Sequence, residues 1–209
     1  MIEHPILFSI DMVRTILDGR KTQTRRVIKP QPADDLKWMG WIIGTGSKSD
    51  KSIGCAQWVD EFPLSTKHHT VRCPYGHTGD RLWVKETFAK SPTSFIYRAD
   101  WNDGHGQEVV DLPTGRTVPL LWKSARFMPH IVSRITLEIV NIRAGLLQKI
   151  TDDDAIQEGV DRTNTSIPGY ARTRFMDLWN SIYFSRPENK WKVNPWVWVI
   201  EFKRLEQTP

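Results

Sequence analysis

The stretch that decides the fold lies near the end of the chain, where residues 196–202 read Trp-Val-Trp-Val-Ile-Glu-Phe. Successive side chains of a strand point to opposite faces of a sheet, and both faces of this run are apolar apart from Glu201. Strands that are buried on both faces read as continuous apolar runs of this kind. Residues 196–202 therefore predict a central strand.

Five other segments predict strands around it. Residues 131–142 give the longest signal, because apolar and polar side chains alternate there with the period of a half-buried strand. Residues 6–8 predict a short first strand, and residues 81–88 predict another, with residues 95–98 as its hairpin partner. The basic residues 21–26 leave a helix and are expected to turn into a strand.

Three segments predict helices. The first begins at Ser9 or Asp11 and ends at Gly19, since glycine readily adopts the left-handed conformation at a helix C-terminus. Thr151 is expected to cap the second, and aspartates 152–154 then lie at the positive end of its dipole. Residues 175–183 carry apolar side chains at helical spacing and predict the third.

Five or more strands, few helices and no regular strand–helix–strand alternation indicate an α+β fold, built as a small mixed β-barrel flanked by helices. We expect one domain over residues 1–209, with irregular loop insertions at about 33–80 and 101–118. Residues 44–52 have the Gly/Ser/Lys composition of a flexible loop and lie between tryptophans.

Composition narrows the class of protein. A formal net charge of +5 and a pI near 9.3 favour anionic partners such as RNA, nucleotides or phosphate. Ten tryptophans predict that some of them lie on a binding surface. Two cysteines, no recognisable signal peptide and no apolar run of membrane-spanning length predict a cytoplasmic protein that does not interact with membranes.

Several motifs occur in a characteristic order. They are Gly19-x-Lys21-x-x-Thr24-x-Arg26, Cys73-Pro74-Tyr75-Gly76, Gly79-Asp80-x-Leu82-Trp83-Val84-x-Glu86-Thr87, and Phe127-Met128-Pro129 with Arg134-Ile135. Together they resemble the ASCH domains, which are related to the PUA fold, and in particular their longer phage and bacterial members. The resemblance extends from residue 6 through the C-terminal strand.

The resemblance implies a β-barrel with a cleft that holds the Lys/Thr segment. Some small bacterial members of the family hydrolyse the acyl amide of N4-acetylcytidine with a Lys, a Thr and a Glu, and these roles carry over to Lys21, Thr24 and Glu86. Other members have been assigned RNA binding or ribonuclease activity. The family thus implies either a nucleoside or nucleobase substrate, or RNA as the partner.

Amide hydrolysis needs a nucleophile, a base that deprotonates it and an acid for the departing amine. The Thr24 hydroxyl is the candidate nucleophile and Lys21 its base, provided that burial and neighbouring arginines bring the pKa of Lys21 toward neutrality. Glu86 ends an apolar strand face, where a partly buried carboxylate needs a partner such as Lys21. In a straight strand residues 21 and 24 point to opposite faces, so the pair requires a bend between them.

Five further residues are candidates for binding the substrate: Arg26, Tyr75, Phe127, Met128 and Arg134. The histidines and cysteines at 55, 68, 69, 73 and 77 match no common zinc spacing, and helix capping accounts for aspartates 152–154, so we expect no metal and no cofactor. The leading hypothesis is a metal-independent amidohydrolase acting on N4-acetylcytidine or related N4-acylated cytosines. The alternatives are an RNA-binding module and a ribonuclease.

Overall fold

A computed structural model describes most of the chain. The described residues are 1–33, 36–42, 55–60, 68–91, 93–101, 108–111, 114–161, 163 and 167–206. Residues 44–52, for which a flexible loop was predicted, lie outside them.

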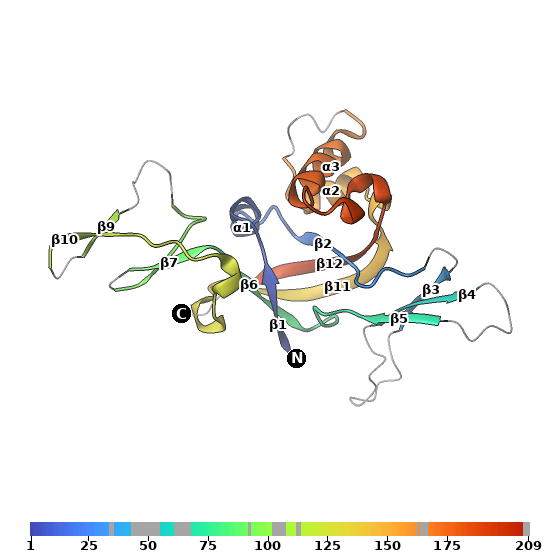
Figure 1. Cartoon of the computed structure of the whole chain (residues 1–209), viewed down its shortest axis with the longest axis horizontal. Helices are drawn as coiled ribbons and strands as arrows, with labels where there is room; N and C mark the ends of the chain where they lie inside the picture. The colour runs from blue at the N-terminus through green and yellow to red at the C-terminus, as the bar shows by residue number, and fades with distance from the viewer. Residues whose placement is uncertain are drawn as a thin grey trace.

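A five-stranded mixed sheet forms the centre of the molecule (Figure 1). Its strands are, in spatial order, β1 (Glu3–Leu7), β6 (Arg81–Lys85), β11 (Thr136–Leu146), β12 (Trp196–Leu205) and β2 (Gln23–Val27). β1 and β6 are parallel, and the other neighbours are antiparallel. The α+β class and the central position of residues 196–202 are confirmed. Within the described residues β1 and β2 are the two edges, so the sheet is not closed into a barrel.

The two faces of β12 explain its apolar sequence. Trp198, Ile200 and Phe202 pack into a core that includes helix α1 (Ile10–Leu17) and the inner residues of β6 and β11. Val197 and Val199 face the other way, into a second core formed with α2 (Asp152–Gln157) and α3 (Tyr170–Ile182). Figure 1 shows α2 and α3 together on one side of the sheet. The strand is apolar on both faces because each face contributes to a different core.

The helix ends follow the predicted signals. The Ser9 side chain accepts a hydrogen bond from the backbone N of Met12, and Gly19 has a φ of +71° just beyond α1. Thr151 and Asp154 form a reciprocal capping box at the start of α2. The local side-chain chemistry therefore determines where α1 and α2 begin.

The expectation of irregular insertions is wrong for the parts that are described. Strands β3 (Leu36–Ile42), β4 (Cys55–Asp60) and β5 (His68–Arg72) form an antiparallel sheet, and β9 (Glu108–Asp111) pairs with β10 (Arg116–Pro119). Trp58 of the three-stranded sheet is completely buried and meets Trp196 of β12 edge to face, with the ring centroids 5.2 Å apart. Tryptophans in the insertion therefore extend the core.

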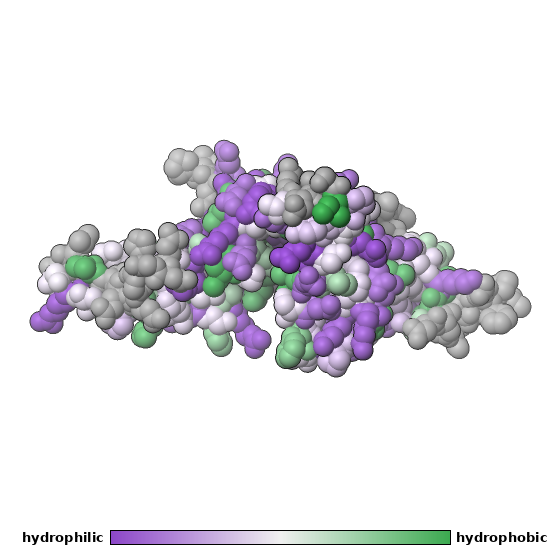
Figure 2. Space-filling view, turned by 90° about the horizontal axis from the view of Figure 1, so that it is seen from above, coloured by the Kyte–Doolittle hydropathy of each residue, from purple (hydrophilic) through white to green (hydrophobic). Residues whose placement is uncertain are grey.

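Two strand boundaries also differ from the prediction. Residues 81–88 are divided between β6 and a short strand β7 (Phe88–Lys90), and it is β7 that pairs with β8 (Phe95–Tyr97). Residues 130–132 form a 3-10 turn, and the long strand begins only at Thr136. Seen from the side of α2 and α3, the described surface is largely hydrophilic (Figure 2). No helix in the described part of the chain has the length and apolarity needed to cross a bilayer.

Candidate active site

Lys21 lies in the link between α1 and β2, before the strand begins at Gln23. Its backbone N donates to the carbonyl oxygen of Thr15 at 2.9 Å, and the backbone N of Thr22 donates to that of Gln157 at 2.8 Å. These bonds fix a turn ahead of the strand. Lys21 is therefore outside the strand alternation, which removes the requirement that it point away from Thr24.

The Lys21 ammonium group is buried and has three acceptors. Its side chain is 0% exposed, and Nζ donates to the Gln23 carbonyl at 2.8 Å, the Glu158 carbonyl at 2.7 Å and Glu158 Oε2 at 2.7 Å. The first of these carbonyls belongs to the peptide bond that joins Gln23 to Thr24. The amino group therefore lies against the backbone of Thr24 and is paired with a buried carboxylate.

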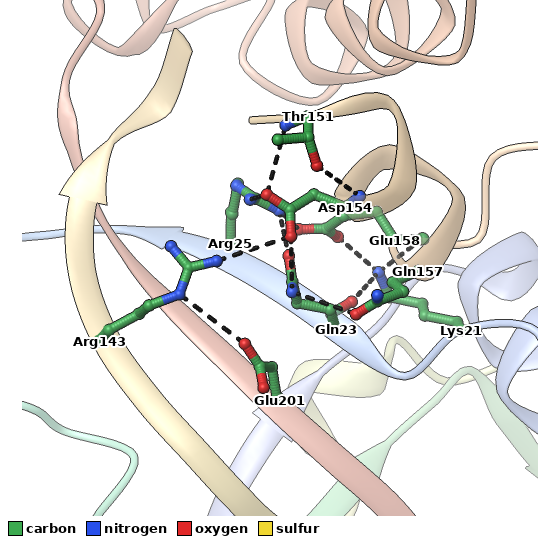
Figure 3. A network of polar contacts seen from close by, with 9 residues as sticks. All are labelled: Lys21, Gln23, Arg25, Arg143, Thr151, Asp154, Gln157, Glu158 and Glu201. Carbon is green, nitrogen blue, oxygen red and sulfur yellow. Dashed lines mark hydrogen bonds and ion pairs between the residues drawn. The ribbon is translucent and has the colours of Figure 1, made fainter. Parts of the chain in front are cut away.

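Glu158 is the C-cap residue of α2, and its carboxylate lies between two cations. Oε2 contacts Lys21, and Oε1 lies 3.3 Å from Arg25 Nη1. Arg25 also contacts Asp154 Oδ2 at 2.8 Å, and the Gln23 amide donates to Asp154 Oδ1 at 3.1 Å. Figure 3 shows these side chains converging from β2 and α2. The network fixes the position of the Glu158 carboxylate.

Gly159 allows this close approach. Its φ is +93°, and a Cβ atom placed there would lie 2.8 Å from Thr15 Oγ1 and 3.3 Å from the Lys21 Cβ. A residue with a side chain would be strained in conformation and would collide with its neighbours. The glycine brings the end of α2 against the link that carries Lys21.

Burial dominates the electrostatics of Lys21. Loss of hydration lowers its pKa below 10.5, the charge and hydrogen bond of Glu158 oppose this shift, and the charges of Arg26 and Arg25 add to it. The direction is the one that a lysine base requires. Among the described residues, Glu158 is the carboxylate that accepts a hydrogen bond from Lys21 Nζ.

A cavity of about 360 Å³ lies beside this network. Thr24, Arg25, Arg26 and Glu158 contribute to its wall, together with Leu7, Phe8, Ser9, Met12, Thr87, Ser124, Ala125, Phe175, Trp179, Ile182 and Tyr183. The polar residues come from β2, the C-cap of α2 and loops, while half of the apolar ones come from α3 and its C-cap. The Thr24 side chain and the Glu158 carboxylate thus both contribute to the wall of one cavity of small-molecule size.

The structure corrects the partner that was expected for Glu86. Glu86 is buried, but Arg134 holds it in a bidentate pair, Nε to Oε1 at 2.8 Å and Nη2 to Oε2 at 3.0 Å. Burial raises the pKa of Glu86, and the bond and charge of Arg134 oppose this. Lys21 is paired with Glu158 instead, because the end of α2 reaches the α1–β2 link. Glu86 does not contribute to the cavity wall, although the next residue, Thr87, does.

The predicted substrate-binding residues separate into two groups. Arg26 lines the cavity. The other four lie outside its lining. Tyr75 packs against the main core, and Phe127 is 73% exposed. Met128 is buried, with its sulfur accepting a hydrogen bond from the Glu86 backbone N, and Arg134 pairs with the Glu86 carboxylate. Among the residues that the structure describes, no group of three His, Cys, Asp or Glu side chains is arranged to hold a metal ion.

Glu158 was missed in the sequence, although a signal for it exists. A carboxylate at the C-terminus of a helix is unfavourable, because the carbonyl end of the helix dipole is negative. Its presence in the sequence Gln157-Glu158-Gly159, just after a well-capped helix, indicates a cationic partner elsewhere. Comparisons with protein-family models, curated proteins and solved structures find no match for this chain.

Proposed function

We propose that the protein is a metal-independent amidohydrolase that removes the acyl group from N4-acetylcytidine or a related N4-acylated cytosine. The observation that supports this most is the 2.7 Å pair of Lys21 and Glu158. Glu158 lines the same small cavity as Thr24, while Lys21 is buried behind the wall and donates to the carbonyl of the residue before Thr24. The resemblance of residues 19–26 to ASCH domains supports the same substrate and a PUA-like fold. Glu158 replaces Glu86 as the proposed acid.

The reaction uses two half-steps. The ion pair of the resting site first loses one proton, which leaves Lys21 as the free amine in the reactive form. Thr24 Oγ1 attacks the acyl carbonyl carbon while its proton passes to Lys21, and the C–N4 bond breaks as N4 takes that proton from the Lys21–Glu158 pair. The products of this half-step are an acyl ester on Thr24 and cytidine. Water then attacks the ester, giving its proton to the same pair, and the carboxylic acid leaves as Thr24 recovers its hydroxyl proton.

The remaining walls of the cavity suit an acylated nucleobase. Phe8, Trp179 and Tyr183 are the aromatic residues of the wall that would contact a base, and the hydroxyl groups of Ser9, Thr87 and Ser124 would supply hydrogen bonds at its edges. A volume of about 360 Å³ accommodates one nucleoside rather than a strand.

The decisive experiment follows the ultraviolet spectrum of N4-acetylcytidine during incubation with purified protein. We expect conversion to cytidine, with kcat reduced at least about a hundredfold in Thr24→Val and Lys21→Met. Glu86→Gln, which alters a buried carboxylate away from the cavity, serves as the matched control for Glu158→Gln. Unchanged substrate at high protein concentration, or a Glu86→Gln variant as inactive as Glu158→Gln, would contradict the proposal.

A parallel titration with single-stranded RNA tests the alternative function. An RNA-binding module would bind with an affinity that falls steeply with salt, because each phosphate contact releases counterions. We expect weak binding with little salt dependence. Tight, salt-dependent RNA binding without deacylation would favour the non-catalytic function, and metal-free cleavage of a labelled strand would favour a ribonuclease.

A further inference from the structure

The cations near the cavity differ in whether they have a counterion. Lys21 is paired with Glu158, and Arg25 is paired with both Asp154 and Glu158. Two arginines and one glutamate line the cavity, so the formal charge of its wall is positive by one. The excess belongs to Arg26.

Arg26 has no carboxylate partner among the residues that the structure describes. Its guanidinium donates to the Leu7 carbonyl and lies 5.0 Å from the centre of the Phe8 ring, while its Nε–H is buried without an acceptor in the described residues. A partly buried cation beside aromatic side chains loses hydration that one carbonyl and one ring restore only in part. A bound anion would supply the missing interaction.

The position of Arg26 relates this anion to the reaction. Thr24 and Arg26 are two residues apart on β2, so their side chains lie on the same face of the strand with Cα atoms roughly 7 Å apart. An arginine side chain that extends from this point reaches a group several bonds away from the carbonyl that Thr24 attacks. Arginine is also the side chain best matched to phosphate, which it binds through two parallel N–H donors.

We infer that this site prefers an acylated cytidine monophosphate to the neutral nucleoside, and that Arg26 binds its phosphate. This inference rests on the proposed function for the identity of the base and acyl group. The size of the cavity limits the ligand to one nucleotide. Arg26 therefore determines specificity for the charge of the ligand.

The test separates binding from catalysis by using a product that cannot react. Cytidine 5′-monophosphate and cytidine are titrated by calorimetry into the wild-type chain, Arg26→Gln and Arg174→Gln. The last variant removes the same charge from an exposed arginine of α3 that does not line the cavity, and it controls for net charge. We expect the wild type to bind the monophosphate about tenfold to a hundredfold more tightly than cytidine. This ratio falls to about one in Arg26→Gln and persists in Arg174→Gln.

The outcomes distinguish the two proposals. A preference for the monophosphate that is lost in Arg26→Gln supports the inference even if no acylated substrate is hydrolysed, in which case the proposed reaction alone fails. Equal affinities for both ligands, no binding of the monophosphate at millimolar concentration, or an unchanged ratio in Arg26→Gln overturns the inference. If the reaction is observed, the kcat/KM ratio of the acetylated monophosphate to N4-acetylcytidine should depend on Arg26 in the same way.

Discussion

Replacing Glu158 by Gln removes one negative charge from the most buried part of the site and leaves a hydrogen-bond acceptor in its place. The Lys21 side chain is 0% exposed and that of Glu158 is 3% exposed, so solvent cannot compensate for the lost charge. Breaking a buried ion pair by removing one partner costs about 3–5 kcal/mol. Because the amide still accepts a hydrogen bond, we expect the lower part of this range, about 3 kcal/mol.

The loss is measured as the free energy of unfolding in urea, monitored by circular dichroism and tryptophan fluorescence. Asp177→Asn is the control, because its pair with Arg174 joins exposed side chains 4.0 Å apart and should contribute at most about 0.5 kcal/mol. A double-mutant cycle with Lys21→Met isolates the pair, and the double variant should be less destabilised than the sum of the two single variants. A Glu158→Gln variant as stable as the control would refute the assignment of Glu158 as the partner of buried Lys21.

The same pair predicts a dependence of stability on pH. The pKa of Lys21 is lower in the folded chain than its ordinary 10.5, because burial outweighs the opposing effect of Glu158. The unfolded chain therefore binds more protons at this group between its folded pKa and 10.5, and its contribution to stability rises with pH in that window. Urea unfolding of the wild type and Lys21→Met should show the wild type gaining stability relative to the variant as pH increases. A difference that stays constant or changes in the opposite direction would contradict the direction of the shift.

Three further substitutions test the supporting structure by urea unfolding. Gly159→Ala places a Cβ 2.8 Å from Thr15 Oγ1 at a φ of +93° and should lower the free energy of unfolding by about 1–3 kcal/mol. Gly115→Ala, at an open position with positive φ, should lower it by less. Equal losses would argue against the close approach of Gly159 to Thr15. Thr151→Ala removes the cap of α2 and should cost about 1 kcal/mol, with Thr151→Ser restoring most of it; a loss that serine does not restore would contradict the capping role. Arg134→Met leaves Glu86 buried without its partner and should lower the free energy of unfolding by about 3–5 kcal/mol at pH 7. The variant should regain stability relative to the wild type as Glu86 protonates on acidification. If it does not, the pairing is refuted.

Features set by local chemistry and alternation were predictable from the sequence. Three signals lie within a few residues of the feature that they predict: the capping Thr151, the helix end at Gly19 and the two apolar faces of residues 196–202. The structure confirms all three. The strands at 36–42 and 55–60 were not predicted, because the Gly/Ser-rich residues between them dominate the composition of that region. The burial of Trp58 depends on Trp196, far away in the chain, and no local pattern shows that contact.

The site was predictable only in part, for a related reason. Lys21, Thr24 and Arg26 belong to one short segment, so their proximity follows from the chain itself. The carboxylate comes from 137 residues away and depends on how α2 packs against β2. Glu86 was predicted to be the acid because it ends an apolar strand face. The Glu86 carboxylate is instead paired with Arg134, since the two residues lie at the neighbouring ends of β6 and β11.

The position of β2 at the edge of the sheet connects the stability of the fold to the site. Among the described strands β2 pairs only with β12, so its other edge carries backbone groups that need partners. The end of α2 covers this region: Thr22 donates to the Gln157 carbonyl, and Lys21 and Arg25 bind Glu158. The contacts that protect the edge of the sheet are thus the contacts that hold the proposed acid next to Lys21. Loss of Glu158 should therefore expose the β2 edge and abolish activity together, whereas Thr24→Val should abolish activity and leave the edge protected. Hydrogen exchange at the amide of Thr22 distinguishes the two cases, and equally fast exchange in both variants would show that α2 does not protect this edge through Glu158.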